Sequence, residues 1–259
     1  MAKSPKRASK PLRNNRLRKV IWIGVIVVLV AFIGCLGLST YVGWNLTHPA
    51  HYALTNFPES LSLAYEDIEF ASRDQVKLKG WLFQNNTNAK KLIVFAHGYS
   101  NNRSYEVGSL PTVKALLAAG YDCLMFDFRN SGLSEGNMTS IGQFEKLDLL
   151  AAIDYGKSRG YEHFGVIGFS MGAATASLAA AESPDIQAVV MDSAFAALRP
   201  YLEENLSVWS HLPDIPFTPM VLWVTPSLIG VDPEQVKPID QMEKLRGKGI
   251  LLIHAKFDP

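Results

Sequence analysis

Apolar runs and helical repeats alternate along most of the chain. Short runs of consecutive apolar residues are typical of buried strands, and stretches with apolar residues three or four positions apart are typical of helices. The predicted strands are a leading antiparallel pair, 65–74 and 77–84, and then 90–98, 121–129, 164–170, 186–194 and 249–255. The predicted helices are 113–120, 144–160 and 171–183. This order indicates an α/β fold, in which a mostly parallel sheet has helices on both faces.

Residues 195–245 interrupt this alternation. They are rich in proline and carry Trp209, Phe217 and Trp223. A connection of this length between two strands is too long for an ordinary loop. We expect a few packed surface helices that also form a cap over a pocket.

The segment 20–44 is almost wholly apolar and contains no charged residue. As a helix of about 24 residues it would be about 36 Å long, enough to cross a bilayer with some tilt. Trp22 lies near one end, and Tyr41 and Trp44 lie near the other, where aromatic residues favour the headgroup region. We therefore predict a transmembrane signal-anchor helix, with a cleaved signal peptide as the alternative.

The charge pattern indicates how this helix is oriented. Residues 1–19 hold eight Lys or Arg and no acid, so the remaining 17 basic residues stand against 24 acidic ones. A basic tail next to an apolar span is typical of a cytoplasmic end, whereas a nucleic-acid arm would not lead directly into such a span. We expect 1–19 in the cytoplasm, a juxtamembrane linker at 45–64, and the domain from residue 65 outside, with a membrane as partner and no nucleic acid.

Composition limits the remaining possibilities. An apolar content of 48% is enough for a sizeable core. Cys35 lies in the apolar span and Cys123 in a predicted strand, so no disulfide framework is implied. The chain carries no spacing of ligand residues typical of a metal site, and we expect no metal and no cofactor.

The decisive pattern is GFSMG, Gly168 to Gly172, at the junction of a predicted strand and a predicted helix. In this setting a serine occupies a tight turn that exposes its hydroxyl at the edge of the sheet. Glycines two residues on either side of Ser170 avoid collisions with the neighbouring backbone. The next helix directs its free N–H groups at any developing negative charge. The alternative is a merely structural glycine-rich turn.

The chain resembles the α/β-hydrolase superfamily and, more narrowly, its membrane-anchored "α/β-hydrolase domain-containing" serine hydrolases. The resemblance rests on five motifs in the family's order. They are AHGYSNNR (96–103), DFRNSGLSEG (127–136), GFSMGAAT (168–175), DSAF (192–195) and IHAKFD (253–258). The motifs lie between residues 96 and 258, and we take residues 65–259 as the hydrolase domain, with the cap at 195–245.

The resemblance implies roles for individual residues. Ser170 is expected to be the nucleophile, and the backbone N–H groups of Tyr99 and Met171 the oxyanion hole. His97 and Gly98 are expected to support the oxyanion loop, although His97 as the base is an alternative. Asp258 takes the role of the acid that orients the catalytic histidine.

The sequence has no histidine at the place where the resemblance puts the catalytic base. The resemblance implies the order Ser…Asp…His, which puts this residue after one more strand. His254 and His163 are interpreted as packed or edge residues, His48 and His51 fall in the linker, and His211 falls in the cap. We interpret the chain as truncated at its C-terminus, with a natural short form or one that borrows another base as alternatives.

The expected function is therefore a serine hydrolase that cleaves acyl bonds. The apolar cap with Trp209 and Trp223 favours an ester, thioester or lipid-like substrate. The 259 residues by themselves are expected to be inactive because the base is absent. A serine peptidase of the same fold and a catalytically inactive membrane-anchored binding or scaffold protein are the alternatives.

Overall fold

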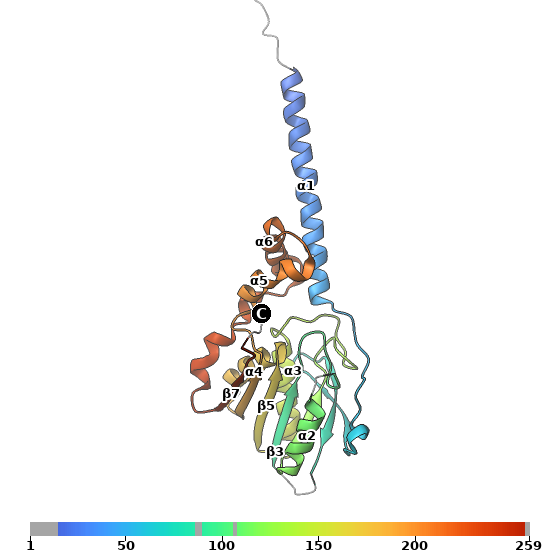
Figure 1. The fold of residues 1–259 in the computed structure, drawn as a ribbon, viewed down its shortest axis with the longest axis vertical. Coiled ribbons are helices and arrows are strands. Elements are labelled where there is room, and N and C mark those ends of the chain that lie inside the picture. The colour runs from blue at the N-terminus through green and yellow to red at the C-terminus, as the bar shows by residue number, and fades with distance from the viewer. Residues whose placement is uncertain (1–14, 86–89, 106–107, 257–259) are drawn as a thin grey trace, which may run out of the picture.

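A single twisted sheet organises the domain (Figure 1). The computed structural model describes residues 15–85, 90–105 and 108–256. Its strands are β1 (Glu66–Ala71), β2 (Lys77–Phe83), β3 (Lys91–Ala96), β4 (Asp122–Phe126), β5 (His163–Phe169), β6 (Ile186–Asp192) and β7 (Gly249–Ile253). They are arranged in the order β1-β2-β4-β3-β5-β6-β7. β1 and β2 are antiparallel, and β4, β3, β5, β6 and β7 are parallel neighbours, which confirms the expected mostly parallel sheet.

Helices cover both faces of this sheet, as expected from the alternating pattern. They are α2 (Ser109–Ala118), α3 (Glu145–Ser158) and α4 (Met171–Glu182). Successive side chains of a strand point to opposite faces. In β4, Leu124 therefore packs in the cluster that includes α3 and α4, while Met125 packs in the cluster that includes α2. α2 begins four residues earlier than predicted because Pro111 falls in its first turn, where proline is tolerated.

The long segment between β6 and β7 is helical. It contains α5 (Leu198–Ser210), α6 (Asp214–Val224), a π-helical turn η2 (Thr225–Ile229) and two 3₁₀ segments, η3 (Pro233–Gln235) and η4 (Pro238–Leu245). α5 and α6 pack on each other, while η4 packs on α4. The repeated prolines explain why the helices are short and separated by bends.

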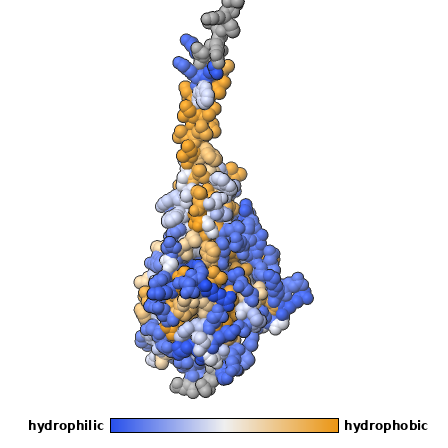
Figure 2. Space-filling model, turned by 180° about the vertical axis from the view of Figure 1, so that it is seen from behind, coloured by the Kyte–Doolittle hydropathy of each residue, from blue (hydrophilic) through white to orange (hydrophobic). Residues whose placement is uncertain are grey.

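The apolar N-terminal segment forms one long helix, α1 (Asn15–Thr47). It has the length and hydropathy of a membrane span. A signal sequence near the N-terminus can have the same properties. Its side chains are exposed from residue 16 to residue 34, and Figure 2 shows this hydrophobic surface running down to a domain that carries many hydrophilic residues. α1 lies beside α6, a contact that the sequence pattern did not predict (Figure 1).

The chain after α1 is held against the domain rather than hanging free. The His51 ring lies 2.7 Å from the Asn130 side-chain oxygen. The Thr55 N–H donates to Ser104 Oγ at 2.9 Å, and Asn102 donates from its side-chain amide to Tyr52 O. A short 3₁₀ turn, η1 (Pro58–Leu61), follows. The expected linker is thus tied to the two loops at the carboxyl edge of the sheet.

β7 forms one edge of the sheet in the described part of the chain. It pairs with β6 in parallel, and all five of its residues are exposed, including Leu251 and Leu252. A consecutive apolar run predicts a strand buried on both faces. Among the described residues, however, β6 is the one strand that pairs with it, and its large side chains are 42–65% exposed.

A buried ion pair joins the two loops that follow β3 and β4. Asp127 is fully buried, and its carboxylate accepts from the backbone N–H groups of Arg103 and Leu133, each at 2.8 Å. Arg103 also donates from its guanidinium to Asp127 and lies over the ring of Trp81, 4.5 Å from its centroid. Burial lowers the pKa of Arg103, and the charge of Asp127 partly opposes that effect. The pair holds the AHGYSNNR loop against the DFRNSGLSEG loop.

Removing this carboxylate should destabilise the domain. Asp127→Asn leaves Arg103 buried without its counter-charge, which costs about 3–5 kcal/mol of unfolding free energy. Urea denaturation of the detergent-solubilised protein measures the change. The control is Glu162→Gln, at the exposed pair with Lys90, where little loss is expected. Equal losses in the two variants would contradict a special role for Asp127.

Candidate active site

Ser170 occupies a strained turn between β5 and α4. Its backbone has φ +49° and ψ −113°, a conformation that residues with a side chain rarely adopt. The Ser170 N–H donates to Asp192 O at 2.8 Å, and the Ala173 and Ala174 N–H groups donate to Ser170 O at 3.0 Å each. Three backbone hydrogen bonds therefore hold the turn that was expected from GFSMG.

The glycines of the motif are required by close backbone contacts. A Cβ on Gly168 would lie 2.4 Å from Gly172 O. A Cβ on Gly172 would lie 2.1 Å from Ala96 O and 2.6 Å from His97 O. The start of α4 therefore lies directly against the end of β3 and the loop that follows it.

This contact brings Ser170 and the predicted oxyanion residues to one cavity of about 460 Å³. Its lining includes Gly98, Tyr99, Ser170 and Met171. As the first residue of α4, Met171 has an N–H that its own helix leaves unpaired. The other walls are largely apolar and come from α1, the loops and α5; they include Leu46, Ile141, Phe195, Leu202 and Trp209.

His97 fastens the loop that carries Tyr99. The Phe128 N–H donates to His97 Nε2 at 3.0 Å, so this nitrogen is unprotonated. The other ring nitrogen then carries the proton and donates to Gly98 O at 2.8 Å. Both ring nitrogens thus bond to backbone groups, which agrees with a supporting role rather than that of the base.

Tyr99 links this loop to the N-terminal helix. Its phenol donates to Leu46 O at 2.6 Å, at the last turn of α1. Burial, with a smaller contribution from Tyr52, raises the pKa of Tyr99 to about 12. The phenol therefore remains a hydrogen-bond donor across the neutral range. Sequence reasoning missed this contact because only the backbone of Tyr99 belongs to the motif.

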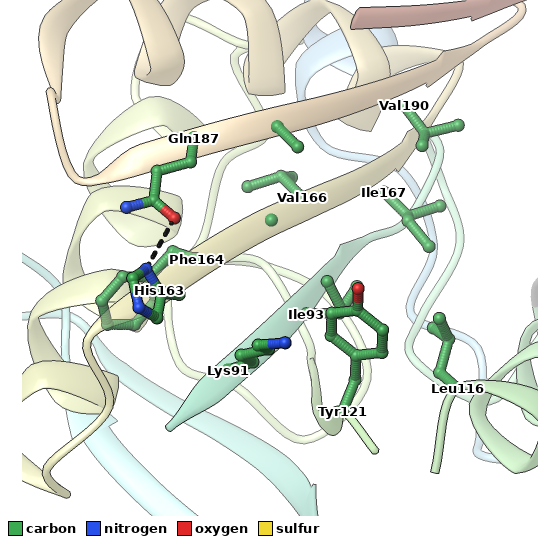
Figure 3. A pocket seen from close by; sticks show the side chains of 12 residues that line it. Lys91, Ile93, Leu116, Tyr121, His163, Phe164, Val166, Ile167, Gln187 and Val190 are labelled. Atoms are coloured by element: carbon green, nitrogen blue, oxygen red, sulfur yellow. Dashed lines mark hydrogen bonds between the residues drawn. The ribbon is translucent and has the colours of Figure 1, made fainter. Parts of the chain in front are cut away.

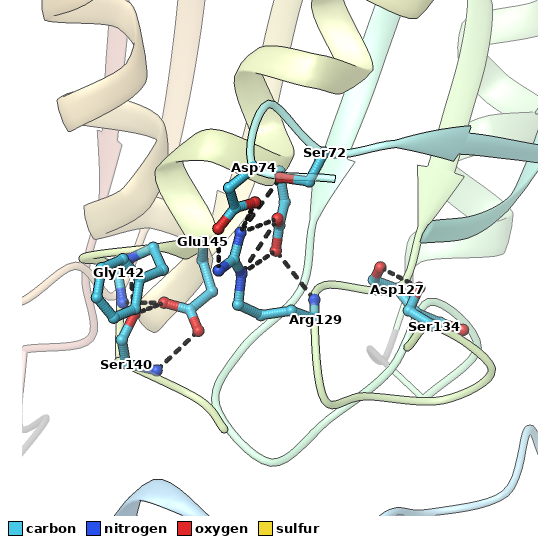
Figure 4. Close-up of polar contacts among 10 residues, drawn as sticks. Ser72, Asp74, Asp127, Arg129, Ser134, Ser140, Gly142 and Glu145 are labelled. Atoms are coloured by element: carbon cyan, nitrogen blue, oxygen red, sulfur yellow. Dashed lines mark hydrogen bonds and ion pairs between the residues drawn. The ribbon is translucent and has the colours of Figure 1, made fainter. Parts of the chain in front are cut away.

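Ile141 supplies a second strained wall of the cavity. It has φ +56°, a conformation that is uncommon for a β-branched residue. Glu145 on α3 holds it in place by accepting from the N–H groups of Ser140 at 2.8 Å and Gly142 at 2.7 Å (Figure 4). Burial raises the pKa of Glu145, and these hydrogen bonds oppose that effect.

Arg129 fixes the start of the same loop region (Figure 4). Its guanidinium donates to Asp148 on α3 and to Asp74 in the turn after β1, with distances of 2.7 Å to each. Burial lowers the pKa of Arg129, but the hydrogen bonds to the two carboxylates outweigh it and leave the pKa above its usual value. This cluster joins three segments: the turn after β1, the loop after β4 and α3.

The remaining histidines differ in their distance from Ser170. His163 opens β5, so the length of that strand, about 20 Å, separates it from Ser170 at the other end. It lies within 3.0 Å of Gln187 at a different hollow on the sheet face (Figure 3). His254, interpreted from sequence as a packed or edge residue, is exposed at the end of the edge strand β7 and lines a hollow of about 490 Å³ with Ser170, Ser193 and Glu204. Asp258 lies outside the described residues.

The geometry of the strand, the serine turn and the helix is that of an α/β hydrolase. A family model described as "alpha/beta hydrolase fold" matches residues 91–215. The chain belongs to the α/β-hydrolase superfamily.

Relatives in the same superfamily include an esterase of known structure. The chain is similar to the Pyrococcus furiosus esterase Pf2001, with a TM-score of 0.64, 30% identity, and coverage of 79% of this chain and 76% of that one. It is also 32% identical to the uncharacterized Bacillus subtilis protein YqkD over 64% of this chain and 54% of that protein. The chain is 28% identical to the Escherichia coli protein YfhR over 71% of this chain and 63% of that protein. The matched part thus spans less than two thirds of these curated relatives.

The close contact at Gly172 can be tested by adding one methyl group. Gly172→Ala should lower the unfolding free energy by about 1–3 kcal/mol, because the new Cβ overlaps the carbonyl oxygen of Ala96. The control is Gly34→Ala on α1, where no atom lies within 4 Å of the added Cβ. Thermal unfolding compares the two. Equal midpoints would contradict the tight packing of α4 on β3.

Proposed function

We propose that the chain is the anchored hydrolase domain of a serine esterase, with Ser170 as its nucleophile. The observation that carries this proposal is the strained position of Ser170 on an apolar cavity that also contains Tyr99 and Met171. A serine with a merely structural role could occupy an unstrained backbone conformation instead. The esterase among the structural relatives adds support.

The reaction follows from this arrangement. Ser170 Oγ attacks the carbonyl carbon of an acyl ester while a base takes the proton of the hydroxyl. The N–H groups of Tyr99 and Met171 stabilise the oxyanion, at about 3 kcal/mol each. The intermediate releases the alcohol, which receives the proton from the base. Water then adds to the acyl-enzyme, and the acid leaves as Ser170 regains its proton.

The base is the part of this reaction that we assign to no described histidine. The two backbone contacts of His97 occupy both of its nitrogens, and His163 lies at the far end of β5. The family order puts the base after Asp258, the acid that would orient it. We infer that the 259 residues by themselves react slowly through Ser170.

Two other functions are compatible with some of the same structural features. A serine peptidase would use the same turn and hole on an amide. An inactive membrane-bound scaffold would keep the fold without using Ser170. The apolar walls at Leu46, Leu202 and Trp209 favour an acyl ester or thioester over a charged peptide.

We also propose that α1 anchors the domain in a membrane. Its apolar length and the basic residues before it support a span with a cytoplasmic N-terminus. The domain from residue 65, with its cap at 195–245, would then lie on the opposite side.

A fluorophosphonate probe tests the role of Ser170. We expect slow labelling of the chain that rises several-fold with added imidazole, since imidazole can take the proton that a missing base would take. Ser170→Ala should abolish both. The control is Ser193→Ala, a serine on the neighbouring hollow, which should label like the parent.

The possible outcomes separate the alternatives. If Ser170 is not labelled, either with or without imidazole, the scaffold is the function that remains. Hydrolysis of p-nitrophenyl esters at ordinary enzyme rates without imidazole would show that a base is present, because losing a triad base costs on the order of a millionfold in kcat. If His254→Ala then removed this activity, His254 would be that base. Faster cleavage of amides than of esters would favour the peptidase.

Protease access tests the orientation. In sealed vesicles with the cytoplasmic face outward, added protease should leave the domain intact until detergent opens the membrane. Digestion of the domain in sealed vesicles would contradict the proposed orientation.

A further inference from the structure

The end of α1 is part of the wall of the Ser170 cavity. Leu46 lines this cavity together with Tyr99 and Trp209. Two hydrogen bonds fix the helix end there: the Tyr99 phenol donates to Leu46 O at 2.6 Å, and the Thr139 N–H donates to Thr47 O at 2.7 Å. The apolar helix is therefore joined rigidly to the site.

α1 also packs closely on the cap. Ser39, Gly43 and Thr47, each four residues apart, are buried on one side of the helix. A Cβ on Gly43 would lie 2.9 Å from Thr225 Oγ1 and 3.2 Å from the Cδ1 atom of Ile229. Small residues at this spacing let helix backbones approach each other. α6 and η2 thus lie directly against α1 (Figure 1).

The contact begins at the level of a bilayer. A hydrocarbon core of about 30 Å takes about 20 helical residues. Counted from Val20, after the last basic residue of the tail, these residues end near Ser39. Ser39 is also the first buried residue of α1, and the residues before it are exposed or half-buried. The top of the cap therefore begins at about the edge of the hydrocarbon.

The cap carries the side chains that such a position requires. Large apolar residues on α5, α6 and the segments that flank them are exposed: Val208, Trp209, Ile215, Trp223 and Leu228. Between Glu204 and Asp232 the sequence has one charged residue, Asp214. In water this grouping would be unfavourable, whereas tryptophan and aliphatic side chains are favoured at a bilayer interface.

We propose that α6, η2 and the end of α5 are seated in the bilayer interface at the C-terminal end of α1, and that the Ser170 cavity takes its acyl ester from that leaflet. The substrate class is a membrane-resident amphiphile with an ester-linked acyl chain. Leu46 and Trp209 would contact this chain as it enters. The ester chemistry rests on the proposed function of Ser170, but the seating of the cap does not.

Spin labelling tests the seating without using activity. In a Cys35→Ala background, where Cys123 is buried, a nitroxide is attached at Leu228→Cys, 68% exposed in the parent. The matched control is Glu162→Cys, an exposed position just before β5, at the amino ends of the parallel strands and so at the other end of the sheet from Ser170. The protein is placed in phosphatidylcholine vesicles, and relaxation of the nitroxide by oxygen, which dissolves in the bilayer, is compared with relaxation by a nickel chelate, which stays in water. We expect the ratio of the oxygen effect to the nickel effect to be several-fold higher at position 228 than at position 162.

Two results would overturn the seating. Equal ratios at the two positions would put the cap in water. Low access to both reagents at position 228, with crosslinks between copies, would mean that a second copy of the chain covers this surface instead.

A second measurement tests the route to the cavity. Ser170→Cys in the same background is treated with a long-chain N-alkyl maleimide dissolved in the vesicles or with a sulfonated maleimide in water. The rate with the membrane-dissolved maleimide, divided by the rate with the sulfonated one, should be several-fold higher for Ser170→Cys than for Glu162→Cys. Equal ratios would refute entry from the leaflet. Since maleimides react with the thiolate that forms in the buffer and do not use the catalytic base, that result would leave Ser170-dependent fluorophosphonate labelling, and hence the proposed function, unaffected.

Discussion

The backbone contact between the start of α4 and the end of β3 is the constraint on which the candidate site depends. Because Gly172 lies against Ala96 O with no room for a Cβ, the helix approaches the sheet more closely than any other residue would permit. This approach produces the turn at Ser170 and brings it to the loop of Gly98 and Tyr99. A residue at φ +49° costs of the order of 1–3 kcal/mol, so the strain persists only because the buried strands and α4 hold both ends of the turn.

Buried carboxylates do for the loops what the glycines do for the turn. Asp127 and Glu145 each accept backbone N–H groups from segments that follow the strands, and Asp148 holds Arg129. Exposed ion pairs add little to stability, but a buried carboxylate that loses its donors is strongly unfavourable. Each of these loops is therefore restricted to one arrangement. Ile141 shows the effect, since its positive φ is kept by hydrogen bonds to its two neighbours and its side chain lines the cavity.

The sequence predicted those features that depend on local pattern. Apolar runs predicted the parallel sheet, and GFSMG at a strand–helix junction predicted the strained serine, since both follow from neighbouring residues. The position of His254 was not predicted, because it depends on how β7 aligns with β6. Nor was the packing of α1 on α6, because an apolar helix looks alike in lipid and against protein. The spacing of Ser39, Gly43 and Thr47 was the available signal, and it becomes informative only when a partner helix is known.

The coupling of α1 to the site changes what an anchor does. A helix joined to a domain by a flexible linker keeps the domain near a bilayer but leaves its orientation free. Here Leu46 and Thr47 are hydrogen-bonded to loops around the cavity, and Gly43 fits against the cap. The angle between helix and cavity is thus set by the fold. Tyr99 holds α1 through its phenol and would hold the oxyanion through its N–H, so any tilt of the helix acts on the same residue that the reaction uses.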